Sequence, residues 1–191
     1  MDLKAFFRNI IIKRLPKGVI YEITKPYKEQ NVYYSQEGED ILLERVFSEK
    51  QAGYYVDIGA HHPTKFSNTY KFYSRGWRVI NIDAMPGSME LFNTLRPRDI
   101  NIEIGISGKE SSLSFYVFDE KAMNTFDKNL ADVYSKTSGK PNIIQVSTLP
   151  LSSVLEKHLP EGQEIDFMSI DVEGFDLEVL KSNDWNRFTP S

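Results

Sequence analysis

The chain has 191 residues, of which 40% are hydrophobic and 26% charged, and it contains no cysteine. This length fits one domain, or one domain with an arm, and the apolar fraction excludes wholesale disorder. The lack of cysteine excludes a disulfide scaffold, a cysteine-ligated zinc site and a thiol nucleophile, and a cytoplasmic location is the simplest expectation. No stretch approaches the roughly 18 apolar residues of a membrane span. The net charge of −4 argues against bulk binding of nucleic acid.

Residues 1–30 form a basic arm, in which seven Lys and Arg against three Asp and Glu give a net charge of +4. The rest of the chain therefore carries about −8. Apolar and basic residues alternate in the arm in a way that predicts a short amphipathic helix, ended by Pro16 and Gly18. Such a helix either binds a membrane surface or a partner, or packs on its own domain or a second copy. The second interpretation is favoured because the helix is short.

Residues 31–191 form the second predicted domain, which alternates between helical and strand patterns. The patterns predict a helix that starts near Ser35, a strand over 54–59, a helix over 67–76, a strand over 78–83, a helix over 87–95 and a strand over 100–106. This alternation predicts an α/β fold with a doubly wound, mostly parallel sheet and helices on both faces.

The regular alternation breaks after residue 106. The patterns predict an extra strand over 113–118, a polar loop that carries Asn124 and Gly139, a short strand over 143–146, a helix over 151–158 started by Ser152 or Ser153, a strand over 165–171 and a helix over 175–181. The first and the last of the main strands, 54–59 and 165–171, are expected to be neighbours in the sheet.

The turn after the strand 54–59 is the first candidate site, because ligands bind at the carboxyl ends of the strands in doubly wound sheets. Gly59 lets a ligand approach the backbone closely. The dinucleotide fingerprint is absent, since His61 stands where its second glycine belongs, and Pro63 has no amide to donate. A ligand without phosphates therefore fits better, and the alternative is an ordinary turn between a strand and a helix.

Two further strand ends carry acids. Asp83 follows Gly59 by 24 residues, the place at which a carboxylate accepts hydrogen bonds from ribose hydroxyls, so the pair indicates a nucleoside ligand. The alternative role of Asp83 is to flank the next helix. Asp171 and Glu173 are suited to orient a substrate hydroxyl, to act as a general base or to hold a cation. Their alternative role is to cap the helix that follows.

The chain also resembles the FkbM-type methyltransferases, which use S-adenosylmethionine. The blocks that carry the resemblance, over about residues 33–188, are Tyr34-Ser35-Gln36-x-x-Glu39-Asp40, Val56-Asp57-Ile58-Gly59-Ala60, Ser67-Asn68-Thr69, Gly76-Trp77 and Ile170-Asp171-Val172-Glu173-Gly174-Phe175. The resemblance implies a Rossmann-like, class I type of methyltransferase that acts mostly on hydroxyls of sugars, glycans or natural products.

The resemblance implies two groups of site residues. The cofactor-binding group is Asp57, Gly59, Ala60, His61, Asp83, Ala84, Gly105, Ile106 and Ser107. Within it, Asp57 and Gly59 line the methionine and ribose part of the cofactor, Asp83 binds the ribose, and residues 105–107 lie near the adenine. The catalytic group beside the methyl group and the acceptor is Asp171, Glu173 and His62.

Asp171 is the first candidate for orienting or deprotonating the acceptor hydroxyl, Glu173 is the second, and His61 and His62 are alternatives because an imidazole titrates near neutral pH. A divalent metal held by the two acids and a histidine is a further alternative, but no compact ligand spacing supports it, so no metal site is predicted. The expected partner is a small-molecule or glycan acceptor, and a homo-oligomer stays open.

Two other classes of function compete with an O-methyltransferase. One is a non-catalytic methyltransferase-like binding or scaffolding module, which the intact acids oppose. The other is a nicotinamide oxidoreductase, which the missing second glycine opposes. The family normally continues with a fifth strand and a carboxyl-terminal pair of strands, so the chain is expected to be truncated after residues 184–190 enter that fifth strand. The strand 165–171 would then be an exposed apolar edge.

Overall fold

The computed structural model describes residues 32–191, and the predicted helix of the basic arm lies outside this range. The elements are α3 (Glu39–Val46), β1 (Tyr54–Ile58), α4 (Tyr70–Ser74), β2 (Arg78–Asp83), α5 (Ser88–Leu95), β3 (Ile100–Glu103), β4 (Gly105–Ile106), β5 (Ser111–Val117), the 3-10 helix η1 (Lys121–Met123), α6 (Lys128–Ser138), β6 (Asn142–Leu149), α7 (Leu151–His158), β7 (Phe167–Ile170) and α8 (Asp176–Lys181). No helix within residues 32–191 is both long enough and apolar enough to cross a bilayer.

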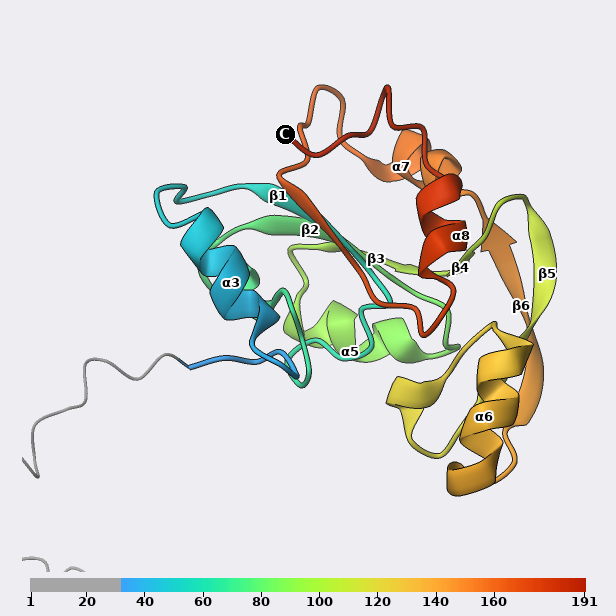
Figure 1. The fold of residues 1–191 in the computed structure, drawn as a ribbon. Helices are drawn as coiled ribbons and strands as arrows, with labels where there is room; N and C mark the ends of the chain where they lie inside the picture. The colour runs from blue at the N-terminus through green and yellow to red at the C-terminus, as the bar shows by residue number, and fades with distance from the viewer. Residues whose placement is uncertain (1–31) are drawn as a thin grey trace, which may run out of the picture. The chain divides into compact units, whose positions relative to one another are not determined.

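Four parallel strands form the main sheet in the order β3-β2-β1-β7, and Figure 1 shows β1, β2 and β7 running in one direction. This confirms the prediction that the first and last main strands are neighbours. It also brings the carboxyl ends of β1, β2 and β7 to one edge of the sheet. The arrangement is an α/β fold that is compatible with the Rossmann-like fold of methyltransferases.

Helices cover both faces of the main sheet. Successive side chains of a strand point to opposite faces, so a strand that is apolar throughout needs cover on both. All five residues of β1 are buried. Tyr54, Val56 and Ile58 belong to a core cluster that includes residues of α7 and α8. Tyr55 points to the other face and packs with Phe72 of α4 and with Trp77, against which residues of α3 lie. The predicted coverage of both faces is thus confirmed.

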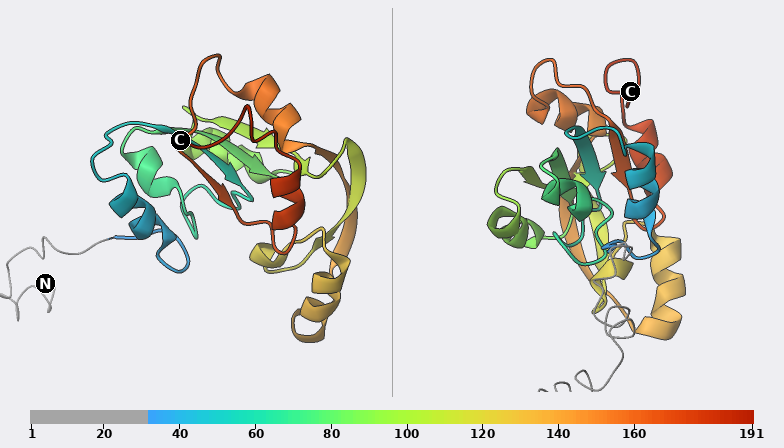
Figure 2. Two further views of the ribbon diagram at one scale, coloured as in Figure 1. Left: turned by 45° about the horizontal axis from the view of Figure 1, so that its top comes forward. Right: turned by 90° about the vertical axis from the view of Figure 1, so that its left-hand side faces the viewer.

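The predicted strand over 100–106 is wrong as a single element. β3 ends at Glu103, and β4 pairs with β6 in a second sheet of order β4-β6-β5. The chain leaves the main sheet after Ile104, whose N–H donates the last hydrogen bond of the ladder between β2 and β3 to the carbonyl of Asp83, and Gly105 and Ile106 then pair with β6. Figure 1 shows the second sheet and α6 on the side of the main sheet away from α3, and Figure 2 shows the same group from two further directions.

The predicted polar loop between the strands β5 and β6 is also wrong, because it contains η1 and the eleven-residue helix α6. Asp127 caps α6, since its Oδ1 accepts hydrogen bonds from the backbone N–H groups of Asn129 and Leu130. Gly139 follows the last turn with a φ of 82°. β6 is longer than predicted, because it pairs along its length with β5.

Smaller differences concern where helices begin. α7 starts at Leu151 after Pro150 and not at a serine cap, because the hydroxyl of Ser152 donates to the carbonyl of Ser182. α3 starts at Glu39, while Ser35 accepts hydrogen bonds from backbone groups just before and within its first turn. α4 covers only the middle of the predicted helix over 67–76.

The backbone after β1 lies close to the backbone after β7 at Gly59. The φ of Gly59 is 80°, a region that favours glycine, and a Cβ atom there would lie 1.9 Å from the carbonyl oxygen of Asp171. The Asp171 N–H donates to the carbonyl of Ile58 at 3.0 Å, which holds the two strand ends together. The predicted need for glycine is therefore explained by this contact between strands and not by a ligand alone.

Replacing Gly59 with alanine is expected to lower the free energy of unfolding by about 2–5 kcal/mol, since left-handed backbone strain and a steric clash add. The matched control is Gly76→Ala, because Gly76 has a φ of 95° but no atom within 4 Å of its missing Cβ. That control is expected to cost about 1 kcal/mol. Denaturant unfolding measures both, and equal losses would contradict the close contact.

Candidate active site

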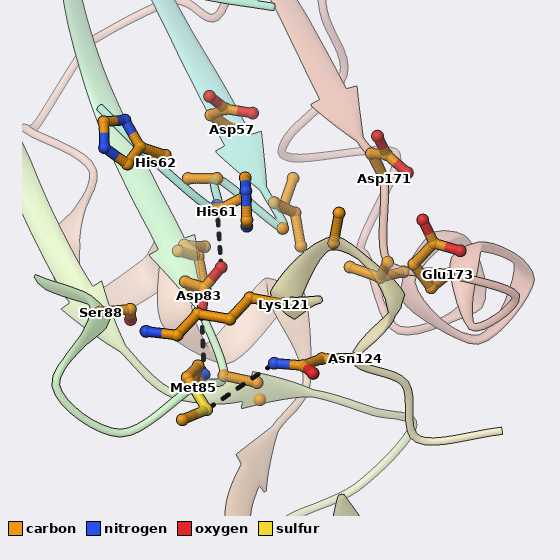
Figure 3. A pocket seen from close by; sticks show the side chains of 18 of the residues that line it. Asp57, His61, His62, Asp83, Met85, Ser88, Lys121, Asn124, Asp171 and Glu173 are labelled. Carbon is orange, nitrogen blue, oxygen red and sulfur yellow. Dashed lines mark hydrogen bonds between the residues drawn. The ribbon is translucent and has the colours of Figure 1, made fainter. Parts of the chain in front are cut away.

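A cavity of about 300 Å³ opens at the carboxyl ends of β1, β2 and β7. It is lined by all of the predicted site residues except Ser107, namely Asp57, Gly59, Ala60, His61, His62, Asp83, Ala84, Gly105, Ile106, Asp171 and Glu173. Figure 3 shows Asp171 and Glu173 together on one side of this pocket, with His61 and Asp83 across from them. The volume is at the lower end of the range of small-molecule sites.

Asp57 lies at the middle of the sheet and is only 4% exposed. Its carboxylate accepts a hydrogen bond of 2.6 Å from the hydroxyl of Thr69. Burial raises the pKa of Asp57, while the hydrogen bond from Thr69 and the charge of Arg96 oppose that rise. Asp57 is paired with Asn81 on β2 and with Ser169 on β7, so polar side chains surround it on both neighbouring strands.

Arg96 follows α5, is fully buried, and supplies the positive charge for this region. Its guanidinium donates to the hydroxyls of Ser67 and Thr69 at 2.7 and 3.1 Å, and to the carbonyl of Pro63 at 2.7 Å. Since Thr69 donates to Asp57, the arginine and the acid are linked through one hydroxyl. A buried charge is stable only when it is paired and hydrogen-bonded in this way.

The Ser67-Asn68-Thr69 block therefore has a structural explanation. Its two hydroxyls hold Arg96, and the side-chain amide of Asn68 donates to the hydroxyl of Ser169 on β7 at 3.3 Å. The block fixes the loop between β1 and α4 to the sheet. The role of Arg96 was not predicted from the sequence, because a charged residue at the end of a helix usually faces solvent. The signal that could have revealed it is the set of polar residues at buried strand positions, which includes Asp57 and Asn81.

Asp83 holds the turn that follows β1. One carboxylate oxygen accepts from the N–H of His61 at 2.9 Å, and the other accepts from the N–H of Met85 at 2.8 Å. Burial raises the pKa of Asp83, and these two backbone hydrogen bonds oppose the rise. The hydrogen bond from His61 accompanies a φ of 53° at that residue, a left-handed conformation that is uncommon for residues other than glycine. Each oxygen keeps a lone pair for a ligand.

Asp171 and Glu173 form a pair of acids at the mouth of the pocket. Partial burial raises the pKa of both, and each carboxylate also feels the negative charge of Asp176. Glu173 accepts a hydrogen bond from the phenol of Tyr134 at 2.7 Å. Asp171 accepts no side-chain hydrogen bond from any residue in the described part of the chain, so its carboxylate is the one free to take a proton.

His62 lies apart from these acids, and Figure 3 shows its ring on the opposite side of the pocket from Asp171. The Nδ1 atom of His62 accepts from the N–H groups of Thr64 and Lys65 at 3.1 and 2.9 Å. Burial and the nearby positive charges of His61, Lys65 and Arg96 lower the pKa of His62. The imidazole of His62 therefore fixes the backbone of the two residues that donate to it, Thr64 and Lys65. Its neutral form is favoured, and only Nε2 is left for other contacts.

Of the remaining predicted residues, Gly105 lines the pocket and Ser107 does not. Gly105 packs closely under Phe126, whose ring would meet an added Cβ at 2.7 Å. Ser107 lies outside the pocket, with its hydroxyl hydrogen-bonded to Thr148 in the second sheet. The reason is the break before β4, which sends the chain away from the main sheet. Asn124 also lines the pocket, and its side-chain amide contacts the sulfur of Met85 at 3.8 Å.

The pocket thus combines Asp83, an acid with free lone pairs, and an apolar wall that was not predicted from the sequence. That wall consists of Met85, Leu91, Ile104, Phe115, Phe126 and Phe175. Such a set suits a nucleoside, with hydroxyls on the carboxylate and a flat base on the wall. Among residues 32–191, no group of three or more His, Asp or Glu side chains is arranged to hold a metal ion.

A sequence model described as the methyltransferase FkbM domain matches residues 57–191. The match confirms the resemblance identified from the sequence and covers every predicted site residue. No curated protein and no solved structure matches the chain significantly.

Replacing Arg96 with methionine is expected to lower the free energy of unfolding by about 3–5 kcal/mol, because it leaves Asp57 buried without a counter-charge. Adding Asp57→Asn should recover part of this loss, by about 1 kcal/mol or more, since the uncompensated charge is then removed. Arg98→Met, at an exposed arginine on the same loop, is the control and should cost less than about 1 kcal/mol. Chemical denaturation of these three variants and of Asp57→Asn alone measures these differences, and strictly additive losses for Arg96 and Asp57 would contradict the pairing.

Proposed function

Because the chain belongs to the FkbM methyltransferase family, we propose that it transfers a methyl group from S-adenosylmethionine to a hydroxyl of a sugar, glycan or other natural product. The observation that carries this proposal is the position of Asp171. Its carboxylate has no side-chain hydrogen bond from the described residues and faces the pocket that also contains Asp83. One pocket thus offers a place for a nucleoside and, beside it, a group that can accept a proton.

The donor set of the pocket fits the cofactor. Asp83 would accept hydrogen bonds from the ribose hydroxyls, and the apolar wall that includes Ile104 and Phe126 would receive the adenine. The turn from Gly59 to His61 would border the methionine part. The bound cofactor supplies a methyl group on a positively charged sulfur, which is a good leaving group.

What is left to the protein is to bring the acceptor oxygen into line and to remove its proton. Asp171 is the residue best suited to take that proton, because its carboxylate is free and its pKa is raised toward the working range. Glu173 would orient the acceptor, since its carboxylate is already fixed by Tyr134. His62 is less suited, because its Nδ1 is engaged by the loop and its ring lies across the pocket.

A non-catalytic module with the same fold is the competing function. The carboxylate of Asp171 argues against it, because an acid with a raised pKa and no side-chain partner lines the same pocket as Asp83, an arrangement that is typical of functional sites. The two functions differ in one outcome, the formation of a methylated product.

The cofactor part of the proposal predicts that the chain binds S-adenosylhomocysteine and that Asp83→Ala weakens this binding about 10- to 100-fold, the value of hydrogen bonds to a charged group. Asp119→Ala, at an exposed acid in the loop after β5, is the matched control and should leave the affinity unchanged. Calorimetric titration measures all three proteins. Equal affinities for the two variants would remove Asp83 from the site.

The catalytic part predicts that Asp171→Asn lowers methyl transfer about 100-fold, the usual contribution of a general base, while the affinity for S-adenosylhomocysteine changes less than about threefold. In the native protein the rate should rise with pH as Asp171 loses its proton and then level off above its raised pKa. Asp171→Asn should lose this rise. Transfer of a labelled methyl group to a panel of sugar glycosides measures the rates, and an unchanged pH profile would contradict the role of Asp171.

A further inference from the structure

Glu173 is held by a segment that lies far from it in the sequence. The phenol of Tyr134, on α6, donates to the Oε2 atom of Glu173 at 2.7 Å. The ring of Tyr134 is fixed in turn by an edge-to-face contact with Phe118, with centroids 5.9 Å apart. Residues 118–141, between β5 and β6, therefore carry the hydrogen-bond donor to the carboxylate of Glu173.

The same segment also holds the backbone of Glu173. The hydroxyl of Thr125, a fully buried residue, donates to the carbonyl of Glu173 at 2.7 Å. Leu130 packs against Gly174, where a Cβ would meet it at 3.1 Å. The φ of Glu173 is 49°, a strained value that persists only when its surroundings fix it. Both the side chain and the main chain of Glu173 are thus set by contacts from residues 118–141.

The charged groups that shift the pKa of Glu173 are carboxylates. Asp171 and Asp176 raise the pKa of Glu173 in addition to burial, and Asp127 borders the neighbouring Gly174. The hydrogen bond from Tyr134 is what opposes these effects. The two neighbouring acids therefore differ in their partners: Glu173 has a donor that favours its charged form, and Asp171 has none among residues 32–191.

We propose that Tyr134 is a positioning residue that holds Glu173 as a fixed hydrogen-bond acceptor for the methyl acceptor and so leaves Asp171 to take the proton. With Oε2 engaged by the phenol, Oε1 remains to receive a hydrogen bond from a second donor group of the acceptor molecule. The acceptor then offers two adjacent donors, the reacting hydroxyl and a neighbour. This inference rests on the proposed function, since it divides two tasks of methyl transfer between the two acids.

The test is the titration of Glu173 followed by NMR in protein labelled with ¹³C-glutamate, with the signal assigned by its loss in Glu173→Gln. Tyr134→Phe should raise the pKa of Glu173 by about one unit, because the charged form loses a hydrogen bond. Tyr116→Phe is the matched control, since it removes a phenol from β5 whose oxygen has no hydrogen-bond partner in the described part of the chain. A Glu173 signal that titrates alike in both variants would overturn the inference.

A second measurement keeps the test decisive if Tyr134→Phe does not fold. Labelling the native protein with 3-fluorotyrosine makes the phenol a stronger donor, so Glu173 should titrate at lower pH than in the unlabelled protein. An unchanged titration would again overturn the inference.

A kinetic measurement separates positioning from a merely structural role. Tyr134→Phe should raise the KM for the acceptor about tenfold, with the affinity for S-adenosylhomocysteine unchanged, and Tyr116→Phe should change neither. A change in cofactor affinity that equals the change in KM would overturn the positioning role. A wrong proposed function would give a different result from a wrong inference. The native protein would then bind no S-adenosylhomocysteine, while the titration of Glu173 would still report its hydrogen bond to Tyr134.

Discussion

The buried pairing of Asp57 with Arg96 through Thr69 is the interaction on which the rest of the site depends. A carboxylate in the middle of a parallel sheet is stable only with a partner, and here the partner comes from the end of α5. The same guanidinium fixes Ser67 and the carbonyl of Pro63. One buried charge pair thus anchors both ends of the loop that carries the pocket turn, and Asp57 acts as much through this anchor as through any contact with a ligand.

Backbone strain marks two opposite sides of the pocket. His61 and Glu173 both have a positive φ, and each is held by a specific hydrogen bond, from its N–H to Asp83 in one case and from Thr125 to its carbonyl in the other. Such strain persists where the surroundings determine the conformation, and it gathers at functional sites. The protein's own contacts therefore fix both sides of the pocket, the turn after β1 through Asp83 and the end of β7 through the segment between β5 and β6.

Much of the main sheet could be predicted from sequence, because residues 54–58 and 79–82 are short, mostly apolar runs that are buried on both faces of the sheet. Asp83 and Asp171 could be predicted as site residues because each stands at the carboxyl end of such a strand. α6 could not be predicted from apolar spacing, since it is mostly polar, although Asp127 and Gly139 are its cap signals. Ser107 was misplaced because the break at Ile104 is set by pairing with β6, a long-range contact. The bond between Tyr134 and Glu173 joins residues 39 apart in sequence and leaves no local pattern.

The most direct test of the account is a crystal structure of the chain with S-adenosylhomocysteine bound. The account predicts that the ribose lies on Asp83, that the adenine lies on the apolar wall with Ile104 and Phe126, and that the sulfur faces Asp171. Glu173 should keep its hydrogen bond to Tyr134 in that complex. A ligand bound elsewhere on the protein, or one whose sulfur lies away from Asp171, would contradict the account.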